Sequence, residues 1–331
     1  MDAFGADISL AVHFVYDGPR LRGVVPFIAA SRNGTDIARL TLPVNSHVRR
    51  VGWLADEPAS VLSAVLKDLR HRYPTAAIAL PQIPRLGPWA DAVRRATTMA
   101  GLQAWTTPQT SSAVASFTDG WPAYVRGRDS KLLRNLRRHW KRLDPADGWR
   151  VALCRDLTDL PAQWDAVLSI ESRSWKHANG SSIDTEPGAA NLYGHVAQRF
   201  AQQRALRLWV LYQHDVPVAH ALAVVDRGVF YLLKNSYDEQ FRSWSPGMAL
   251  VWHAMENAAS EGIQRTDFLG DAADWKRPLS TDLPEYESWL LFPAWHLRAQ
   301  GLRFIDQVLK PPVRAFRAWR SQRHAAPLAT S

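Results

Sequence analysis

The sequence predicts a mixed α/β fold arranged as two domains in tandem. Segments with the apolar pattern of strands alternate with helical segments in both halves of the chain, the order expected of mixed sheets covered by helices. A length of 331 residues allows two domains that each bury a core. A hydrophobic content of 47% and a charged content of 21% are typical of globular proteins.

The first half reads in order as strands, a helix, a strand and a helix. Residues 8–30 alternate apolar and polar side chains on either side of Asp17-Gly18-Pro19, which predicts a hairpin. A helix is predicted over 58–72, because a proline opens it and apolar residues follow at helical spacing. A strand over 76–83 and a helix over about 86–100 complete this half.

A basic helix is predicted between the halves, within residues 129–148. Ser130 suits the N-cap, and leucines together with Trp140 form an apolar stripe, while lysines and arginines crowd the other positions. Such a helix can bind a phosphate-rich partner, or it can pack by its stripe and leave a solvated basic face. The sequence leaves both interpretations open.

The second half begins with a short strand at 149–154 and a helix that starts at 158–161. Glu171 lies on the apolar side of this helix with Trp175, so burial would raise the pKa of its carboxyl group towards that of a general base. The alternative is a solvated or paired glutamate, with Arg173 or Lys176 as the partner. A loop over 177–187 then separates this helix from the next one.

The remaining pattern of the second half centres on a strand hairpin, a turn and a helix. Strands at 217–225 and 228–235 are joined at Asp226-Arg227, which predicts a hairpin. The turn Ser245-Pro246-Gly247 precedes a helix that ends at Gly262. Free N–H groups at such a helix start favour an anion, which predicts a phosphate-binding site. The residues expected to form it are Arg242, Ser245, Pro246, Gly247 and Met248.

Charge and cysteine content limit the partners and the compartment. The net charge is +9 and the pI is near 9.9. Such a positive charge suits binding to nucleic acid, to an anionic membrane surface or to a phosphorylated cofactor. The alternative is that the charge reflects a general preference for arginine over lysine. A single cysteine, Cys154, indicates a reducing, cytoplasmic location, and no signal peptide or membrane-spanning run is recognised. The basic tail at 311–331 is predicted to lie on an anionic membrane or nucleic acid, or to pack back on the protein.

Several chemistries lack their motifs. No histidine pair has the spacing of a metal site, so no metal is expected. The glycine-rich patterns of nucleotide hydrolases and dinucleotide-binding enzymes are absent, as is the GxSxG of hydrolases. Cys154 has no base near it in sequence, which disfavours a nucleophilic role.

Four short motifs, together with the order of the elements that carry them, resemble the GNAT superfamily of acyltransferases, specifically its CelD/BcsL-like branch. These motifs are SYDEQF, SPGMAL, DFLG and a following WK. That branch is similar to the FemABX peptidyltransferases. The resemblance implies two tandem GNAT-like domains: a degenerate copy without a donor site over 1–128, and a catalytic domain over 149–310. The basic helix would join them.

The resemblance also implies an N-acyltransferase that moves an acyl group from acyl-CoA to an amine by direct attack. Backbone amides of the strand at 228–235 would polarise the donor oxygen, and either Glu171 or Asp267 would accept the proton. Tyr237 would act as an acid or a positioning hydroxyl, or only pack. The residues expected beside the acceptor are Trp175, Asn235, Gly270, Trp275 and Lys276.

Two alternatives remain at this level. The turn before Met248 has fewer glycines than the common GNAT signature and lacks its basic residue, so an aminoacyl-tRNA donor, as in FemABX-like enzymes, is the nearest alternative. The basic helix, the pI and Lys276, which parallels a lysine of the FemABX-like enzymes, favour this alternative. A non-catalytic basic protein that binds an anionic polymer or membrane is the second alternative. The acceptor, whether a small molecule, peptide, saccharide or lipid, is not specified.

Overall fold

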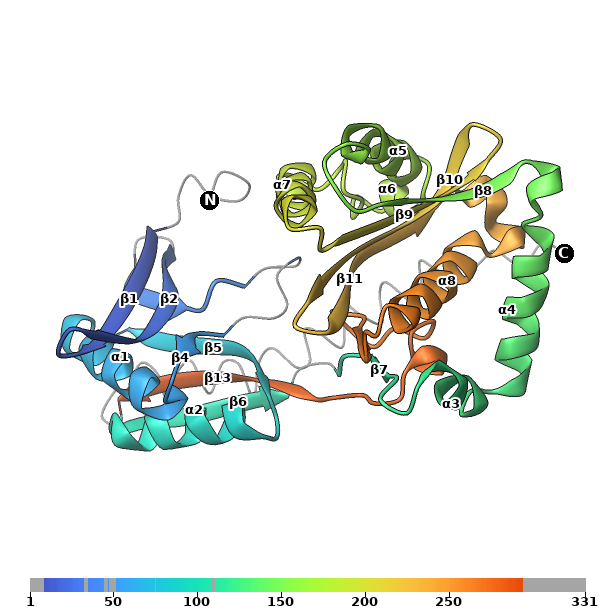
Figure 1. The fold of residues 1–331 in the computed structure, drawn as a ribbon. Helices are drawn as coiled ribbons and strands as arrows, with labels where there is room; N and C mark the ends of the chain where they lie inside the picture. The colour runs from blue at the N-terminus through green and yellow to red at the C-terminus, as the bar shows by residue number, and fades with distance from the viewer. Residues whose placement is uncertain are drawn as a thin grey trace, which may run out of the picture. The chain divides into compact units, whose positions relative to one another are not determined.

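The computed structural model describes residues 9–32, 35–44, 47, 52–74, 76–108 and 111–293. Contacts divide the chain into two compact units: unit I is built on Ile8–Gln109 and the strand after Tyr286, and unit II on Thr110–Tyr286. The predicted tail at 311–331 lies outside the described residues. Each unit is a mixed α/β structure with its own sheet and core, so the predicted fold class is confirmed (Figure 1).

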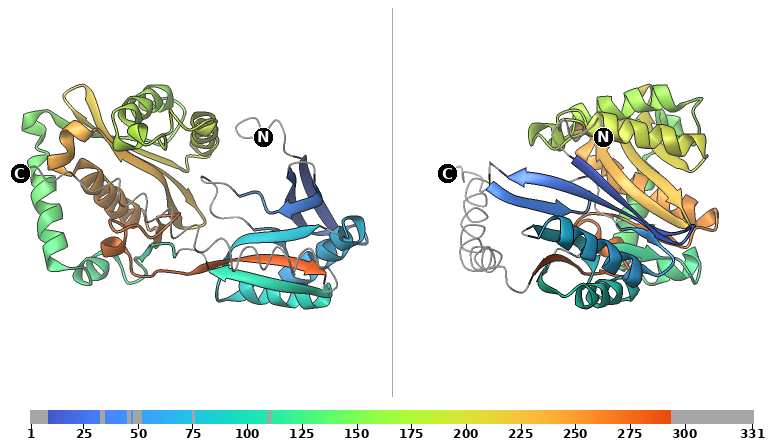
Figure 2. Two further views of the ribbon diagram at one scale, coloured as in Figure 1. Left: turned by 180° about the vertical axis from the view of Figure 1, so that it is seen from behind. Right: turned by 90° about the vertical axis from the view of Figure 1, so that its left-hand side faces the viewer.

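Unit I contains a seven-stranded sheet in the order β1-β2-β3-β5-β13-β6, with β4 paired to β2. Its strands are β1 (Ser9–Asp17), β2 (Arg20–Arg32), β3 (Thr35–Thr41), β4 (Leu54–Ala55), β5 (Ala77–Pro84), β6 (Leu102–Pro108) and β13 (Tyr286–Pro293). The helices α1 (Pro58–Arg72) and α2 (Pro88–Met99) pack on this sheet, and Leu62, Leu66 and Leu69 of α1 are fully buried there (Figure 2). The helix predicted over 58–72 is confirmed.

The strand β13 belongs to this sheet although it follows the whole of unit II in sequence. It pairs antiparallel with β6, and Trp289 and Leu291 contribute to the core of unit I. The chain therefore leaves unit I after β6, forms unit II, and returns to complete the first sheet.

Unit II contains a six-stranded sheet in the order β7-β12-β11-β10-β9-β8. Its strands are β7 (Val114–Ser116), β8 (Trp149–Cys154), β9 (Leu206–Gln213), β10 (Val216–Asp226), β11 (Val229–Tyr237) and β12 (Arg265–Asp267). Four of these strands form an antiparallel meander, and β11 pairs with β12 in parallel. The parallel pair needs a crossover, and α8 (Pro246–Ser260) supplies it.

Helices cover both faces of this sheet. α5 (Leu160–Ser172), α6 (Trp175–Ala178) and α7 (Ala189–Gln202) lie on one face, and α8 lies on the other (Figure 1). Alternate residues of β10 separate two cores, with Leu222 packed towards α5 and α7 and Ala221 towards α8. Two further helices, α3 (Trp121–Arg126) and α4 (Ser130–Arg142), precede the sheet's outer strand β8.

Three local details differ from the sequence predictions. The N-cap of α4 is Asp129, whose carboxylate accepts a hydrogen bond from Leu132 N at 2.9 Å, and not Ser130. The hairpin of β10 and β11 turns at Arg227-Gly228, because both residues have the positive φ that a two-residue turn of this type requires. The helix that carries Glu171 ends at Ser172, so Trp175 begins a separate short helix.

Candidate active site

The pairing of β11 with β12 stops partway along β11. The two strands pair in parallel as far as Tyr231 with Asp267, after which β12 ends and β11 continues to Tyr237. Opposite β10, the register of β11 shifts between Leu232 and Lys234, so Leu233 forms a β-bulge at this point. Beyond Tyr231, β11 therefore has an edge that is not paired with β12 and can hydrogen-bond a ligand.

The N-terminus of α8 follows directly from this strand. Ser245 adopts the left-handed conformation, with φ of 50°, and its side chain caps no N–H of the helix. Pro246 has no N–H, so Gly247 and Met248 supply the first donors of the helix. A Cβ on Gly247 would lie 3.0 Å from Cδ1 of Tyr237, so a larger residue would push against that ring. The predicted phosphate turn and Tyr237 are thus neighbours.

Basic residues flank the segment before this turn. Arg242, predicted to bind the donor, is exposed and forms a 3.7 Å ion pair with Glu239. Arg142 of α4 donates a hydrogen bond to the carbonyl of Ser243 at 3.2 Å, and its guanidinium lies 4.1 Å from the centre of the Trp244 ring. The basic helix therefore holds the segment that leads into α8.

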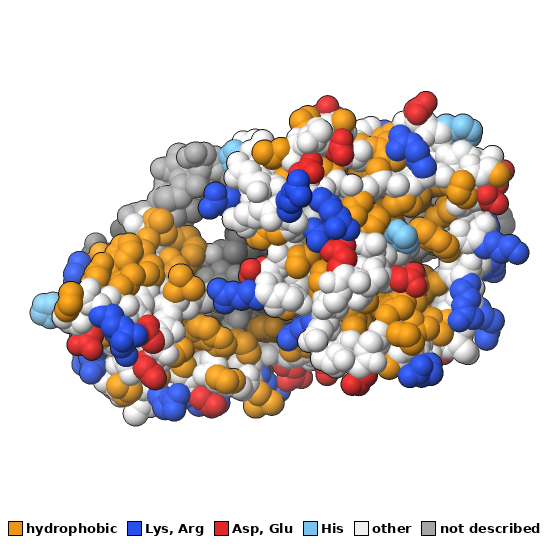
Figure 3. All heavy atoms as spheres, viewed as in Figure 1, with side chains coloured by type: hydrophobic (Ala, Val, Ile, Leu, Met, Phe, Trp, Pro, Cys, Tyr) orange, Lys and Arg blue, Asp and Glu red, His pale blue; other side chains and the backbone are white. Residues whose placement is uncertain are grey.

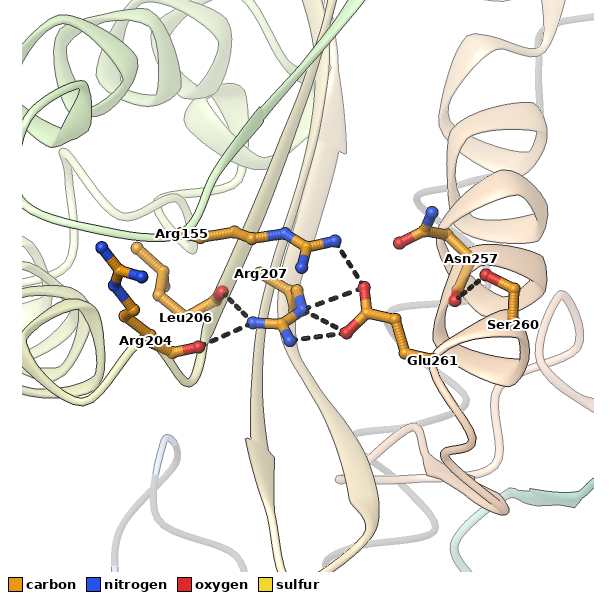
Figure 4. A network of polar contacts seen from close by, with 7 residues as sticks. All are labelled: Arg155, Arg204, Leu206, Arg207, Asn257, Ser260 and Glu261. Carbon is orange, nitrogen blue, oxygen red and sulfur yellow. Dashed lines mark hydrogen bonds and ion pairs between the residues drawn. The ribbon is translucent and has the colours of Figure 1, made fainter.

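An ion-paired cluster fixes the other end of α8. Glu261 caps α8, and both of its oxygens accept hydrogen bonds from Arg207 of β9, the shortest at 2.5 Å. Arg155, after β8, adds a contact of 2.6 Å to the same carboxylate (Figure 4). Arg207 also donates to the carbonyls of Arg204 and Leu206, so α8 is tied to the sheet at its C-terminal end.

Glu171 lies on the opposite face of the sheet and is fully buried. Its carboxylate accepts hydrogen bonds from Nε2 of His220 at 2.8 Å and from the backbone N–H of Ile183 at 3.1 Å. Burial alone would raise the pKa of Glu171, but His220, the Lys176 charge and Ile183 outweigh it and lower the pKa to about 2. The expectation of a raised pKa is therefore wrong. Of the two alternative partners considered, Arg173 binds Asp238 instead, whereas the charge of Lys176 does act on Glu171.

The hydrogen-bond partner of Glu171, His220, was not predicted from the sequence. His220 is fully buried, and burial lowers its pKa more than Glu171 raises it, so the imidazole is neutral and donates from Nε2. Burial also lowers the pKa of Lys176, whose ammonium donates to the backbone carbonyl of Asn235 in β11. The sequence did contain a clue to His220, because this histidine interrupts the apolar strand β10 and faces the same side of the sheet as the buried Leu222.

Asp267, Gly270 and Lys276 lie around the end of β12. Asp267 is buried, and its Oδ1 accepts a hydrogen bond from Leu269 N at 2.9 Å. The ammonium of Lys276 donates to the carbonyls of Phe268 at 3.1 Å and Leu269 at 2.6 Å. A Cβ on Gly270 would lie 3.9 Å from this ammonium. The structure therefore brings these predicted residues into one cluster.

The remaining predicted substrate residues occupy different surroundings. Trp175 is 49% exposed at the start of α6, beside the Lys176 that binds Asn235. Trp275 packs edge-on against Phe268 at 6.0 Å and belongs to the Lys276 cluster. Tyr237 is half-buried, and burial together with the nearby Glu239 raises its pKa, so the phenol keeps its proton at neutral pH.

Cys154 lies in a buried position of β8. Burial raises the pKa of Cys154 to about 11, and its thiol donates to the carbonyl of Asp156, which fits the predicted inert thiol. Within the described ranges, no group of His, Cys, Asp and Glu side chains is arranged to hold a metal ion. In the same part of the chain, no helix combines the length and apolar character needed to cross a membrane.

Comparisons with known proteins agree with this architecture. Residues 130–277 match the family described as acetyltransferase (GNAT) domain. FemX has a TM-score of 0.58 over 89% of this chain and 90% of its own, at 10% identity. The C-terminal domain (DUF2156) of an Agrobacterium fabrum protein described as a lysylphosphatidylglycerol synthetase has a TM-score of 0.57 over 89% of this chain and 86% of its own, at 12% identity.

A third structure, L-PGS from Bacillus licheniformis, has a TM-score of 0.53 over 87% of this chain and 86% of its own, at 10% identity. At these identities the likeness concerns the fold alone. No curated protein matches the sequence. The match of residues 130–277 to the acetyltransferase (GNAT) domain supports an acyltransferase.

Proposed function

We propose that unit II transfers an acyl group from acyl-CoA to an amine. The observation that carries this proposal is the open edge of β11 beside the N-terminus of α8, within the segment that matches the GNAT domain. Coenzyme A phosphates would lie on the N–H groups of Gly247 and Met248, where the helix dipole favours negative charge, with Arg242 adding a positive charge. The thioester would extend along β11.

The reaction needs no covalent enzyme intermediate. The amine nitrogen attacks the thioester carbon, the backbone N–H groups of β11 stabilise the oxygen's developing charge, and the C–S bond then breaks. Tyr237 keeps its proton at neutral pH and would donate it to the departing thiolate. The attacking nitrogen gives up its proton to a base, for which we propose Asp267, since His220 and the N–H of Ile183 hold Glu171 as a low-pKa carboxylate.

The clusters on either side of β11 would position the substrates. Lys176 holds the Asn235 carbonyl of β11, while Lys276 holds the backbone that follows β12. We propose Trp175, Gly270 and Trp275 as acceptor contacts beside them. We propose that unit I is a degenerate copy of the GNAT-like domain that lacks a donor site. We also propose a location in the reducing cytoplasm, because the single cysteine is free.

Calorimetric titration with acetyl-CoA tests the donor. In Gly247→Val the new side chain presses on the Tyr237 ring and covers the helix start, so affinity should fall about tenfold or more. The matched control is Gly194→Ala, because a Cβ there meets nothing closer than 3.6 Å and should leave binding unchanged. Arg242→Gln, on an exposed residue, tests the same site if Gly247→Val does not fold. Absence of acetyl-CoA binding to the unaltered protein would refute the proposal.

An aminoacyl-tRNA donor is the second candidate. It is favoured by the likeness of the whole chain to FemX and by the basic residues of α4, which include the exposed Arg134 and Arg138. A tRNA fraction titrated at two salt concentrations tests it, because phosphate contacts make binding steeply salt-dependent. Salt-dependent tRNA binding without acetyl-CoA binding would replace the first candidate by the second.

A further inference from the structure

A groove lies between α3, α4 and α8, within unit II. It has a volume of about 590 Å³, which falls in the range of sites for small organic ligands. The lining residues are Trp121, Pro122, Val125, Arg126, Leu133, Leu136, Arg137, Trp140, Lys141, Trp252, His253 and Glu256. Figure 3 shows hydrophobic side chains over α3 and α8, bordered by the Lys and Arg side chains of α4.

Aromatic rings form the walls of this groove. Trp121 packs against Trp252 with 4.9 Å between ring centres, and its Nε1 donates to Glu256 at 3.0 Å. Trp140 is 37% exposed and stacks on His253 at 4.6 Å. Burial lowers the pKa of His253 despite the opposing effect of Glu256, so this ring is neutral and belongs to the aromatic wall. The walls are therefore held in place and apolar.

The rim of the groove carries three basic side chains. Among contacts between described residues, Arg126, Arg137 and Lys141 take part in no ion pair. The acidic side chain in the lining, Glu256, is already bound to the indole of Trp121. An apolar floor beside three cations suits a molecule with an apolar body and an anionic head.

We propose that this groove binds an anionic amphiphile, with its alkyl or aryl part between Trp121 and Trp140 and its phosphate or carboxylate head on Arg137 and Lys141. The site is separate from the proposed donor turn, so it holds whichever donor the enzyme uses. The chain's own segment from 294 onward is a poor occupant, because its arginines would face the cations of the rim. A polyanion bound along α4 would also contact the lysines and arginines of α4 that lie outside the groove. Substituting those residues therefore distinguishes a polyanion from an amphiphile.

The experiment uses dodecyl phosphate below its micellar concentration, titrated into the full chain and followed by calorimetry. Butyl phosphate and inorganic phosphate test the apolar part, and dodecylphosphocholine tests the net negative charge of the head. The test variant is Arg137→Gln/Lys141→Gln, whose residues line the groove. The matched control is Arg134→Gln/Arg138→Gln, which removes the same charge from the same helix outside the lining.

We expect dodecyl phosphate to bind, with affinity rising with chain length and falling about tenfold or more in the groove variant but less than about twofold in the control. The substitution Trp140→Ala should weaken the binding of dodecyl phosphate more than the binding of inorganic phosphate, because it removes part of the apolar wall and no charge. Equal losses in both double variants would overturn the proposal in favour of a polyanion on α4, for which a twelve-nucleotide RNA is the direct probe. Binding that ignores the chain length, or no binding, would also overturn it.

Discussion

The substitution Glu171→Gln tests whether the buried carboxylate is a structural anion. Glutamine keeps the shape of the side chain but offers one acceptor oxygen to two donors, the imidazole of His220 and the N–H of Ile183. One buried donor is left unsatisfied, which costs about 1–3 kcal/mol, and Lys176 loses a nearby negative charge.

The pKa of Glu171 gives a second route to the magnitude. It lies at about 2 in the folded protein against an ordinary 4.5, and each pKa unit corresponds to about 1.4 kcal/mol, so ionisation contributes at most roughly 3 kcal/mol, less the share that a charged His220 would supply. Because the folded pKa is depressed, this stability is complete above pH 4.5 and is lost as the pH falls towards 2. We expect a loss of about 1–3 kcal/mol at pH 7, which lowers Tm by roughly 2–12 °C.

Urea unfolding followed by circular dichroism at pH 7, 5, 4 and 3 measures this effect. The difference between the unaltered protein and Glu171→Gln should be constant from pH 7 to about 5 and should shrink at pH 4 and 3. Asp165→Asn, an exposed carboxylate on the same helix, is the control and should change stability by less than about 0.5 kcal/mol. A loss below about 1 kcal/mol at pH 7, or a difference that persists unchanged to pH 3, would refute the reasoning.

Two further predictions concern α8 and the cysteine. Arg207→Met should cost about 1–3 kcal/mol in urea unfolding, because it removes the main partner of the Glu261 carboxylate. Arg155→Met, at a more exposed site, should cost under about 1 kcal/mol, and equal losses would contradict the geometry. At pH 8 the raised pKa of Cys154 leaves about 100-fold less thiolate than an ordinary thiol, so iodoacetamide should label it only in urea, as mass spectrometry would show. Rapid labelling of the folded protein would argue against its burial.

Some features of the fold follow from local sequence. The helix predicted over 58–72 matches α1, because a proline at its start and apolar residues at helical spacing act within a few turns of chain. The end of α8 near Gly262 is likewise local, since glycine adopts the left-handed conformation with φ of 79° at little cost. The turn before α8 and the burial of Cys154 were also predicted in this way.

The site depended on contacts between distant segments. Glu171 and His220 are 49 positions apart, and their hydrogen bond reverses the effect of burial on the glutamate's pKa, which no local pattern reveals. The pairing of β13 with β6 is similar, because a strand's partner is chosen by where its apolar face can be buried. The sequence by itself determined the helices, turns and α/β class. Only the tertiary structure decided which charges meet, because burial makes such pairings favourable or costly.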